Sequence, residues 1–161
     1  RTCLVGSEMC IRDRFEGADR RTTTRLLDGE FPKYRSLLPS ESSTHARVDT
    51  ASLIEAVKRV ALVAERNTPL RLTFSGAEVA LRAGNGEDAQ AEEVVEASID
   101  GDDIEIAFNP VYLQDGLTSI DAATAQFAFT QATRPAVITG MVDGTSVEEY
   151  RYLLMPVRLT G

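Results

Sequence analysis

The chain of 161 residues contains few of the side chains that build disulfides, metal sites and active centres. It has no tryptophan, one histidine (His45) and two cysteines, Cys3 and Cys10, both within the first ten residues. The rest of the chain therefore excludes disulfides and thiolate metal sites. No run of about 18 apolar residues suggests a membrane-spanning helix, and no signal-peptide pattern occurs. These features are compatible with a reducing compartment, and we expect a cytoplasmic protein.

Basic residues are scarce in one long interval. Seventeen Lys and Arg stand against twenty-five Asp and Glu, a net charge of −8, so attraction to phosphates alone cannot produce tight DNA binding. Between Arg82 and Arg134 there is no basic residue, whereas the interval holds eleven acidic ones. The composition fits either a solvated acidic surface or a contact with a basic partner surface.

Residues 1–14 show neither hydrophobic periodicity nor a capping pattern, and they contain both cysteines. Residues 7–14, Ser-Glu-Met-Cys-Ile-Arg-Asp-Arg, look like translated sequencing-adapter DNA, and the chain does not begin with Met. We therefore expect residues 1–14 to be non-native and set them aside from the fold argument. The alternative is a genuine disordered N-terminus.

A domain boundary is predicted near residue 44. Thr22–Leu27 is β-branched and predicts a strand, followed by a turn at Asp28-Gly29. Pro39–Thr44 is polar and typical of a linker. We therefore assign residues 15–44 to the end of one domain and its linker, and residues 45–161 to a complete domain.

The first predicted helix is capped by Asp49 or Thr50 and ends near Glu65. Apolar residues recur at spacings of three and four from Leu53 to Ala64, which forms one stripe. Leu62 and Val63 lie off this stripe. They fit either the flank of a wide core face or apolar contacts for another subunit.

The second predicted helix begins after Asn109, a good N-cap, with Pro110 at its first position, and it runs to about Leu117. Alternating or short apolar runs predict strands around it. These are residues 46–48, 70–74, 79–81, 93–99, 104–108, 125–129, 136–138 and 152–159. Turn signals at Gly76, Gly84–Gly86 and Asp100–Asp102 join neighbouring strands as hairpins, so we predict an antiparallel α+β fold.

Signals for catalysis are weak. His45 lies next to the predicted linker, at the domain boundary, and the chain has no Gly-x-Ser-x-Gly elbow and no glycine-rich phosphate loop. Asp100, Asp102 and Asp103 flank a hairpin turn and lack the spacing of a calcium loop. We expect no catalytic residue, no metal and no cofactor.

Two apolar segments, Phe31–Pro39 and Tyr152–Gly161, are better candidates for function. C-termini are normally polar and frayed, so an apolar one indicates a docked final strand or a binding surface. Met adapts to varied ligands, Pro stops a strand edge from pairing fully, and Arg158 is suited to anchor a carboxylate or carbonyl. The simpler alternative is a terminal strand that completes the sheet.

These segments, in this order and about 120 residues apart, resemble the bacterial DNA polymerase III sliding clamp, the β subunit and processivity factor. The resemblance covers residues 17–161 and implies a fragment: the end of the clamp's second domain and most of its third. It implies a DNA-clamp fold, with two helices packed on an antiparallel sheet, and a non-catalytic role.

The resemblance also implies a partner cleft for short Gln-Leu-x-Leu-Phe-like motifs of the replicative polymerase, the clamp loader and repair proteins. By motif position its residues are Pro32, Ser36, Leu37, Leu153, Met155, Pro156, Val157, Arg158 and Leu159. Many clamps carry a second basic residue at the position of Ser36. The rest of the cleft belongs to a part of the second domain that the chain lacks, so we expect weak binding.

In this family, subunits pair head to tail as a homodimer ring that encircles duplex DNA without sequence preference. The resemblance implies apolar interface contacts at Leu62 and Val63 and an acidic edge at Glu87, Glu92, Glu93 and Glu96. The DNA-facing candidates are Lys58, Arg59 and Arg66. The main alternative is a stand-alone α+β ligand-binding or interaction domain with no DNA role. A hydrolase that uses the acid-rich turns has no motif to support it.

Overall fold

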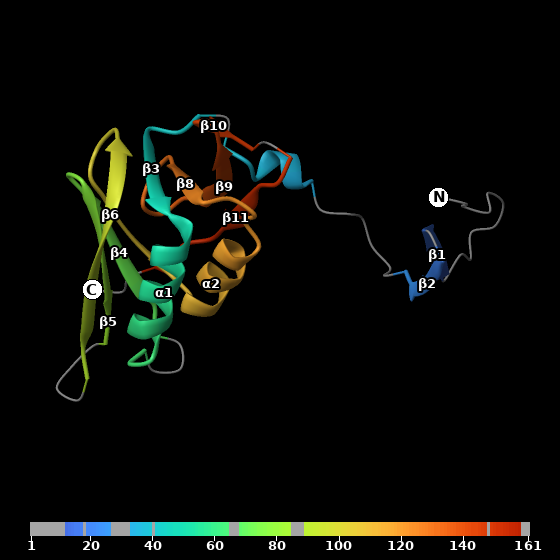
Figure 1. Cartoon of the computed structure of the whole chain (residues 1–161), viewed down its shortest axis with the longest axis horizontal. Coiled ribbons are helices and arrows are strands. Elements are labelled where there is room, and N and C mark those ends of the chain that lie inside the picture. Colours follow the sequence, from blue (N-terminus) through green and yellow to red (C-terminus); the bar gives the residue numbers. More distant parts are fainter. Residues whose placement is uncertain are drawn as a thin grey trace. The chain divides into compact units, whose positions relative to one another are not determined.

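The computed structural model divides the chain into two compact units, Arg1–Lys33 and Tyr34–Gly161 (Figure 1). In the first unit, β1 (Arg12–Gly17) pairs antiparallel with β2 (Arg20–Arg25). The predicted strand at Thr22–Leu27 is confirmed in part: β2 begins earlier, at Arg20, and ends at Arg25, and Leu27 lies outside the described residues. Strand β1 includes residues 12–14, and the origin of residues 1–14 stays a prediction. The residues that the structure describes are 12–17, 19–26, 33–39, 41–64, 68–84, 89–147 and 149–158.

The second unit contains a nine-stranded antiparallel sheet and two α-helices, which confirms the predicted α+β class. Eight strands follow the order β10-β9-β8-β3-β6-β5-β4-β7, and β11 pairs with β9. The strands are β3 (Thr44–Asp49), β4 (Leu70–Ser75), β5 (Glu78–Ala83), β6 (Ala91–Asp100), β7 (Ile104–Phe108), β8 (Thr124–Phe129), β9 (Ala136–Val142), β10 (Thr145–Ser146) and β11 (Tyr152–Leu154).

Strand β6 joins the two halves of this sheet. Its first part, from Ala91 to Glu96, pairs with β5, and its last part, from Ala97 to Asp100, pairs with β3. Residues 91–96 consequently have a strand partner on one side only within the described chain. This leaves a free edge beside the first helix.

Helix α1 (Thr50–Ala61) begins where the sequence predicts, because the Asp49 carboxylate accepts a hydrogen bond of 2.8 Å from the Ser52 backbone N–H. It ends before the predicted limit near Glu65, which lies outside the described residues. Backbone bonds from Leu62 to Arg59 and from Ala64 to Ala61 span only three residues, so the helix tightens into a turn after Ala61.

Helix α2 (Pro110–Thr118) confirms its predicted start, since the Asn109 side chain accepts a hydrogen bond from the Val111 N–H at 2.9 Å. The two helices pack side by side against the sheet (Figure 1). Between helices and sheet lies one apolar core, at whose centre the rings of Phe74, Phe127 and Phe129 lie 5.0 to 5.8 Å apart. No helix in the described ranges is long and apolar enough to cross a membrane.

The predicted terminal strand at residues 152–159 is confirmed for its first three residues and wrong for residues 155–158, while residue 159 lies outside the described residues. Strand β11 ends at Leu154, one residue before Met155 and two before Pro156. The chain then crosses to the far edge of the sheet, where the Val157 N–H donates to the Ala107 carbonyl of β7 at 2.8 Å. The last segment therefore contacts β9 near one end of the sheet and β7 at the other end.

The predicted linker is also shorter than expected. Thr44 is already part of β3, is buried, and donates its hydroxyl to the Asp102 carbonyl at 3.0 Å. The Ser43 N–H bonds the Phe129 carbonyl at 2.8 Å, and the Thr130 hydroxyl bonds the Glu41 carbonyl. These bonds attach the segment before β3 to the sheet.

The cap of α1 gives a pH-dependent contribution to stability. The Ser52 hydrogen bonds lower the pKa of Asp49 below its ordinary 3.8, so the stabilisation is complete above pH 3.8 and is lost as the pH falls through the folded-state pKa. We expect Asp49→Ala to cost about 1 kcal/mol of unfolding free energy at pH 7. Denaturant titrations should show the difference from the unsubstituted chain shrinking in acid. Asp49→Asn, which keeps a capping oxygen, should retain most of the stability at pH 7, and an equal loss in both variants would contradict the cap.

Candidate interfaces

Apolar side chains remain exposed on the segment that follows β11. Leu153 is half-buried and its backbone pairs with Val137 of β9, whereas Leu154 is in the core. Met155 is 62% exposed and Val157 37%, with the half-buried Pro156 between them. The backbone of this segment is anchored while its side chains face solvent, which is suited to binding an apolar ligand.

Part of this segment lines a hollow of about 280 Å³ at the edge of β7. Its walls combine apolar side chains with one acidic and one basic group. They are Glu105, Ile106, Ala107, Ala132, Thr133, Pro156, Val157 and Arg158.

The other predicted wall of the cleft belongs to the segment that contains the short 3₁₀ helix η1 (Tyr34–Ser36). The residues after this helix line a second hollow of about 160 Å³. There Leu38 and Pro39 lie with Val137, the residue that pairs with Leu153. The two apolar segments therefore approach the same strand. Of the predicted cleft residues, Ser36, Leu37, Leu153 and Met155 line neither hollow. Pro32 and Leu159 lie outside the described residues.

Helix α2 adds two exposed apolar residues that the sequence reasoning missed, Val111 and Tyr112. The hydroxyl of Tyr152 on β11 donates to the Tyr112 carbonyl at 3.0 Å, which ties this helix to the last strand. Burial raises the pKa of Tyr152, which further favours the protonated phenol that donates this bond. The adjacent valine and tyrosine in the first turn of the predicted helix were the available signal.

A larger groove of about 620 Å³ lies between α1 and the free edge of β6. Four carboxylates and one guanidinium surround it. Its lining residues are Asp49, Ala51, Ser52, Glu55, Arg59, Glu93, Val94, Val95 and Glu96.

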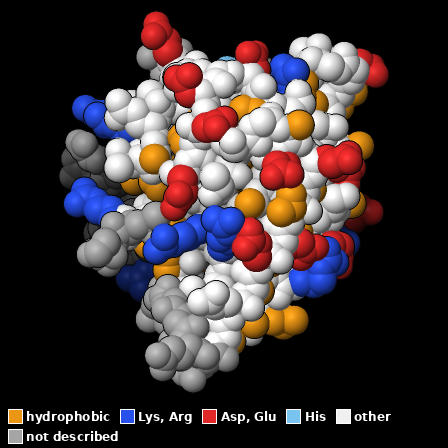
Figure 2. Space-filling model, turned by 90° about the vertical axis from the view of Figure 1, so that its left-hand side faces the viewer, with side chains coloured by type: hydrophobic (Ala, Val, Ile, Leu, Met, Phe, Trp, Pro, Cys, Tyr) orange, Lys and Arg blue, Asp and Glu red, His pale blue; other side chains and the backbone are white. Residues whose placement is uncertain are grey.

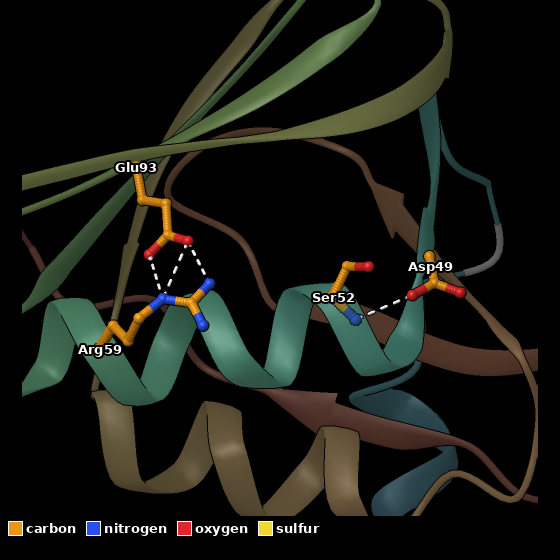
Figure 3. A network of polar contacts seen from close by, with 4 residues as sticks. All are labelled: Asp49, Ser52, Arg59 and Glu93. Atoms are coloured by element: carbon orange, nitrogen blue, oxygen red, sulfur yellow. Dashed lines mark hydrogen bonds and ion pairs between the residues drawn. The ribbon is translucent and has the colours of Figure 1, made fainter.

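Arg59 and Glu93 bridge this groove (Figure 3). The Nε of Arg59 is 3.1 Å from both carboxylate oxygens of Glu93, and its terminal nitrogen contacts one of them. Glu93 lies on the same face of β6 as Ala91 and Val95, which pack against the core, and its side chain is only 26% exposed. A carboxylate on this side of the strand needs a partner, and the guanidinium supplies it from α1.

Other basic residues are paired as well. Arg82 contacts Glu92 at 2.7 Å and Lys58 contacts Glu55 at 2.8 Å. These bonds lower the pKa of both carboxyl groups. Figure 2 shows the side of the molecule that lies at the left of Figure 1, near β4, β5 and β6, where acidic side chains are spread with the fewer basic ones beside them. The basic residues upstream of residue 83 thus neutralise part of the acidic stretch that follows it.

The remaining predicted interface residues differ in exposure. Leu62 is 84% exposed, whereas Val63 is half-buried and packs against the core. Glu96 is exposed and lies directly opposite Glu78 on β5. Glu87 and Arg66 lie outside the described residues.

Comparison with known proteins relates this geometry to one family. The family described as DNA polymerase III beta subunit, C-terminal domain, matches residues 35–158. The beta sliding clamp of Streptomyces coelicolor is 57% identical over 149 residues, which cover 91% of this chain and 40% of that protein. A crystal structure of the sliding clamp from Pseudomonas aeruginosa with a ligand superposes with a TM-score of 0.81 at 29% identity, over 94% of this chain and 40% of that one. Another from the same organism, bound to griselimycin, gives a TM-score of 0.78 at 31% identity, over 86% and 37%.

Two helices on this antiparallel sheet, shared with these structures, define a DNA-clamp domain. The chain belongs to the DNA polymerase III beta subunit family, the bacterial sliding clamps, and matches its C-terminal domain. It spans about 40% of the length of the curated relatives. The alternative of a stand-alone domain without a DNA role is not favoured by these relationships.

The ion pair of Glu92 can be checked by titration. The Arg82 guanidinium holds the pKa of Glu92 below its ordinary 4.5, and we expect Arg82→Gln to raise it toward that value. Carbon-detected NMR of the side-chain carboxyl group measures this directly. Arg71→Gln, on the neighbouring strand, is the matched control and should move the Glu92 titration less. Equal titrations in the unsubstituted chain and in Arg82→Gln would show that the pair does not persist in solution.

Proposed function

We propose that the chain forms the C-terminal part of a sliding-clamp subunit in the cytoplasm. The complete protein would encircle duplex DNA as a homodimer and tether the replicative polymerase, the clamp loader and repair proteins. In this role the chain supplies surfaces and performs no catalysis. Family membership supports the proposal. Three surfaces of the described residues, discussed below, support its separate parts.

The observation that carries the partner-binding role is the exposed apolar segment from Met155 to Val157. Its backbone is held by β9 at one end and by β7 at the other. A ligand therefore meets side chains whose backbone is already ordered, and binding costs less conformational entropy. Met155 is unbranched and polarisable, which suits a surface that receives several different partners.

Short motifs of the form Gln-Leu-x-Leu-Phe match this surface in chemistry. Their leucine and phenylalanine side chains would lie against Met155, Pro156 and Val157, with Leu37 and Leu153 as neighbouring apolar surface. Arg158 would meet a carbonyl or carboxylate of the ligand. Ser36 offers a hydroxyl where many clamps have a cation, so this polar contact is weaker.

The contribution of Met155 can be measured with the 161-residue chain and the peptide Gln-Leu-Ser-Leu-Phe. Because Met155→Ala removes apolar area from the contact, we expect roughly a tenfold loss of affinity. An NMR titration of the labelled chain follows weak binding and locates the perturbed amides. Val142→Ala, at an exposed valine at the other end of β9, is the matched control and should leave affinity unchanged. Equal losses in both variants, or no perturbation near residues 153–158, would contradict the assignment.

The groove between α1 and β6 is our candidate for the contact between subunits. Residues 91–96 have a free strand edge, and such edges pair with strands of other chains. Glu92, Glu93 and Glu96 give this edge a negative charge that complements basic residues, and Glu87 would extend it. Because Glu92 and Glu93 already have internal partners, Glu96 has the largest unneutralised charge of the three.

The proposed DNA-facing role of α1 depends on the ring that the complete protein would form around DNA. It does not require a strong positive charge on the helix. Lys58 is paired with Glu55 and Arg59 with Glu93, so the described face of this helix has little net positive charge. A ring that encloses DNA needs only weak contacts to remain on it. We therefore assign Lys58, Arg59 and Arg66 a weak, non-specific attraction to the duplex.

Substitutions of Leu62 and Val63 distinguish the proposed contact between subunits from packing in the core. In a complete subunit, Leu62→Ala should weaken dimerisation roughly tenfold without lowering Tm, because the side chain is exposed in the monomer. Val63→Ala should lower Tm as well, since this residue packs on the core. Sedimentation measures the dimer, and retention on nicked circular DNA, lost on linearisation, measures the ring. A Leu62→Ala variant that dimerises and stays on circular DNA normally would refute this interface.

A further inference from the structure

Gly116 of α2 lies directly against the ring of Tyr152. A Cβ atom at residue 116 would lie within 2.5 Å of two ring carbons of Tyr152, well inside van der Waals contact. The backbone of Gly116 is helical, with a negative φ that any residue adopts. Glycine in a helix interior costs about 1 kcal/mol relative to alanine. The missing side chain is therefore explained by the close approach of the tyrosine and not by backbone conformation.

The Tyr152 ring is fixed by contacts on several sides. It is half-buried against the core, its hydroxyl donates to the Tyr112 carbonyl, and its backbone pairs with Ile138. Since β11 has only three residues, this side chain is a principal anchor of the strand.

Met155 lies three residues after this anchor, and two residues further the Val157 N–H bonds the Ala107 carbonyl. The exposed segment is therefore held at one end by the contacts of the Tyr152 ring and at the other end by the hydrogen bond to the edge of β7. A displacement of the ring would shift Leu153 and Met155 relative to α2, whereas the second anchor would remain.

We propose that Gly116 is a positioning residue for the peptide-binding segment: its missing side chain admits the Tyr152 ring, which sets the place of Leu153 and Met155. The inference rests on the proposed peptide-binding function of that segment. Gly116 itself does not contact the ligand. It acts through Tyr152, so that the packing of α2 on β11 determines the shape of the binding surface.

The test compares two glycine-to-alanine variants of the 161-residue chain. Gly116→Ala crowds Tyr152. Gly140→Ala, on β9, crowds Ala122 and Ile120 of the same unit, at 2.8 and 3.1 Å, without touching Tyr152. The probe is the peptide Gln-Leu-Ser-Leu-Phe, followed by NMR titration, with Tm measured in parallel. Met155→Ala is included as the indicator of the binding surface.

We expect Gly116→Ala to weaken peptide affinity roughly fivefold and to shift the amide signals of residues 152–156. Gly140→Ala should lower Tm by a similar amount because overpacking destabilises both sites, and its affinity should be unchanged. If Gly116→Ala and Gly140→Ala weaken binding equally, or if neither does while Met155→Ala does, Gly116 has no positioning role. If Met155→Ala also has no effect, the proposed peptide surface itself is wrong.

Tyr152→Leu covers the case in which Gly116→Ala does not fold. This variant removes the ring and hydroxyl without adding a clash, and it should also weaken the peptide while the chain stays folded. Unchanged affinity in a folded Tyr152→Leu variant would overturn the proposal. Tyr152→Phe, which keeps the ring, should bind nearly as well as the unsubstituted chain.

Discussion

The continuous strand β6 is the constraint on which the rest of the second unit depends. Its first part pairs with β5 and its last part with β3, so a single strand carries both halves of the sheet. This pairing joins β8 and β9 to the same sheet as β4 and β5, and Phe74 meets Phe127 and Phe129 in one core. It also leaves residues 91–96 with one open edge, where the candidate subunit contact lies.

The arrangement also determines how charge is distributed on the surface of a markedly acidic chain. Fourteen of the 17 basic residues precede residue 83, whereas 14 of the 25 acidic residues follow it, so the part of the chain after residue 83 is strongly acidic. The antiparallel pairing places the two sets together, as with Arg82 and Glu92, and helix packing adds Arg59 with Glu93. Exposed pairs of this kind contribute little individually. Their main effect here is on the charge that a partner or DNA would meet.

Local signals in the sequence predicted much of this fold. Asp49, Asn109 and Pro110 marked the helix starts because a cap is a contact between neighbouring residues. The Asp143-Gly144 turn was an equally local signal, since both residues have positive φ, but it was overlooked, and with it strand β10. The length of β11 depends on its pairing with β9 and on the crossing to Ala107, which apolar composition does not encode.

The candidate surfaces were predictable to different degrees for the same reason. Met155 and Pro156 were identifiable through a resemblance in the sequence, whereas their exposure depends on packing. The pairing of Arg59 with Glu93 and the contact of Gly116 with Tyr152 join residues 34 and 36 positions apart. Contacts between residues so far apart in the sequence depend on how the strands and helices are connected and packed, and no short sequence motif predicts them.

The central claim is that the segment after β11 is a partner-binding surface of a clamp domain. A crystal structure of the chain with the peptide Gln-Leu-Ser-Leu-Phe tests it most directly. The account predicts that the leucine and phenylalanine side chains of the peptide contact Met155, Pro156 or Val157. A peptide seated elsewhere, or a complex in which Met155 stays exposed, would contradict it.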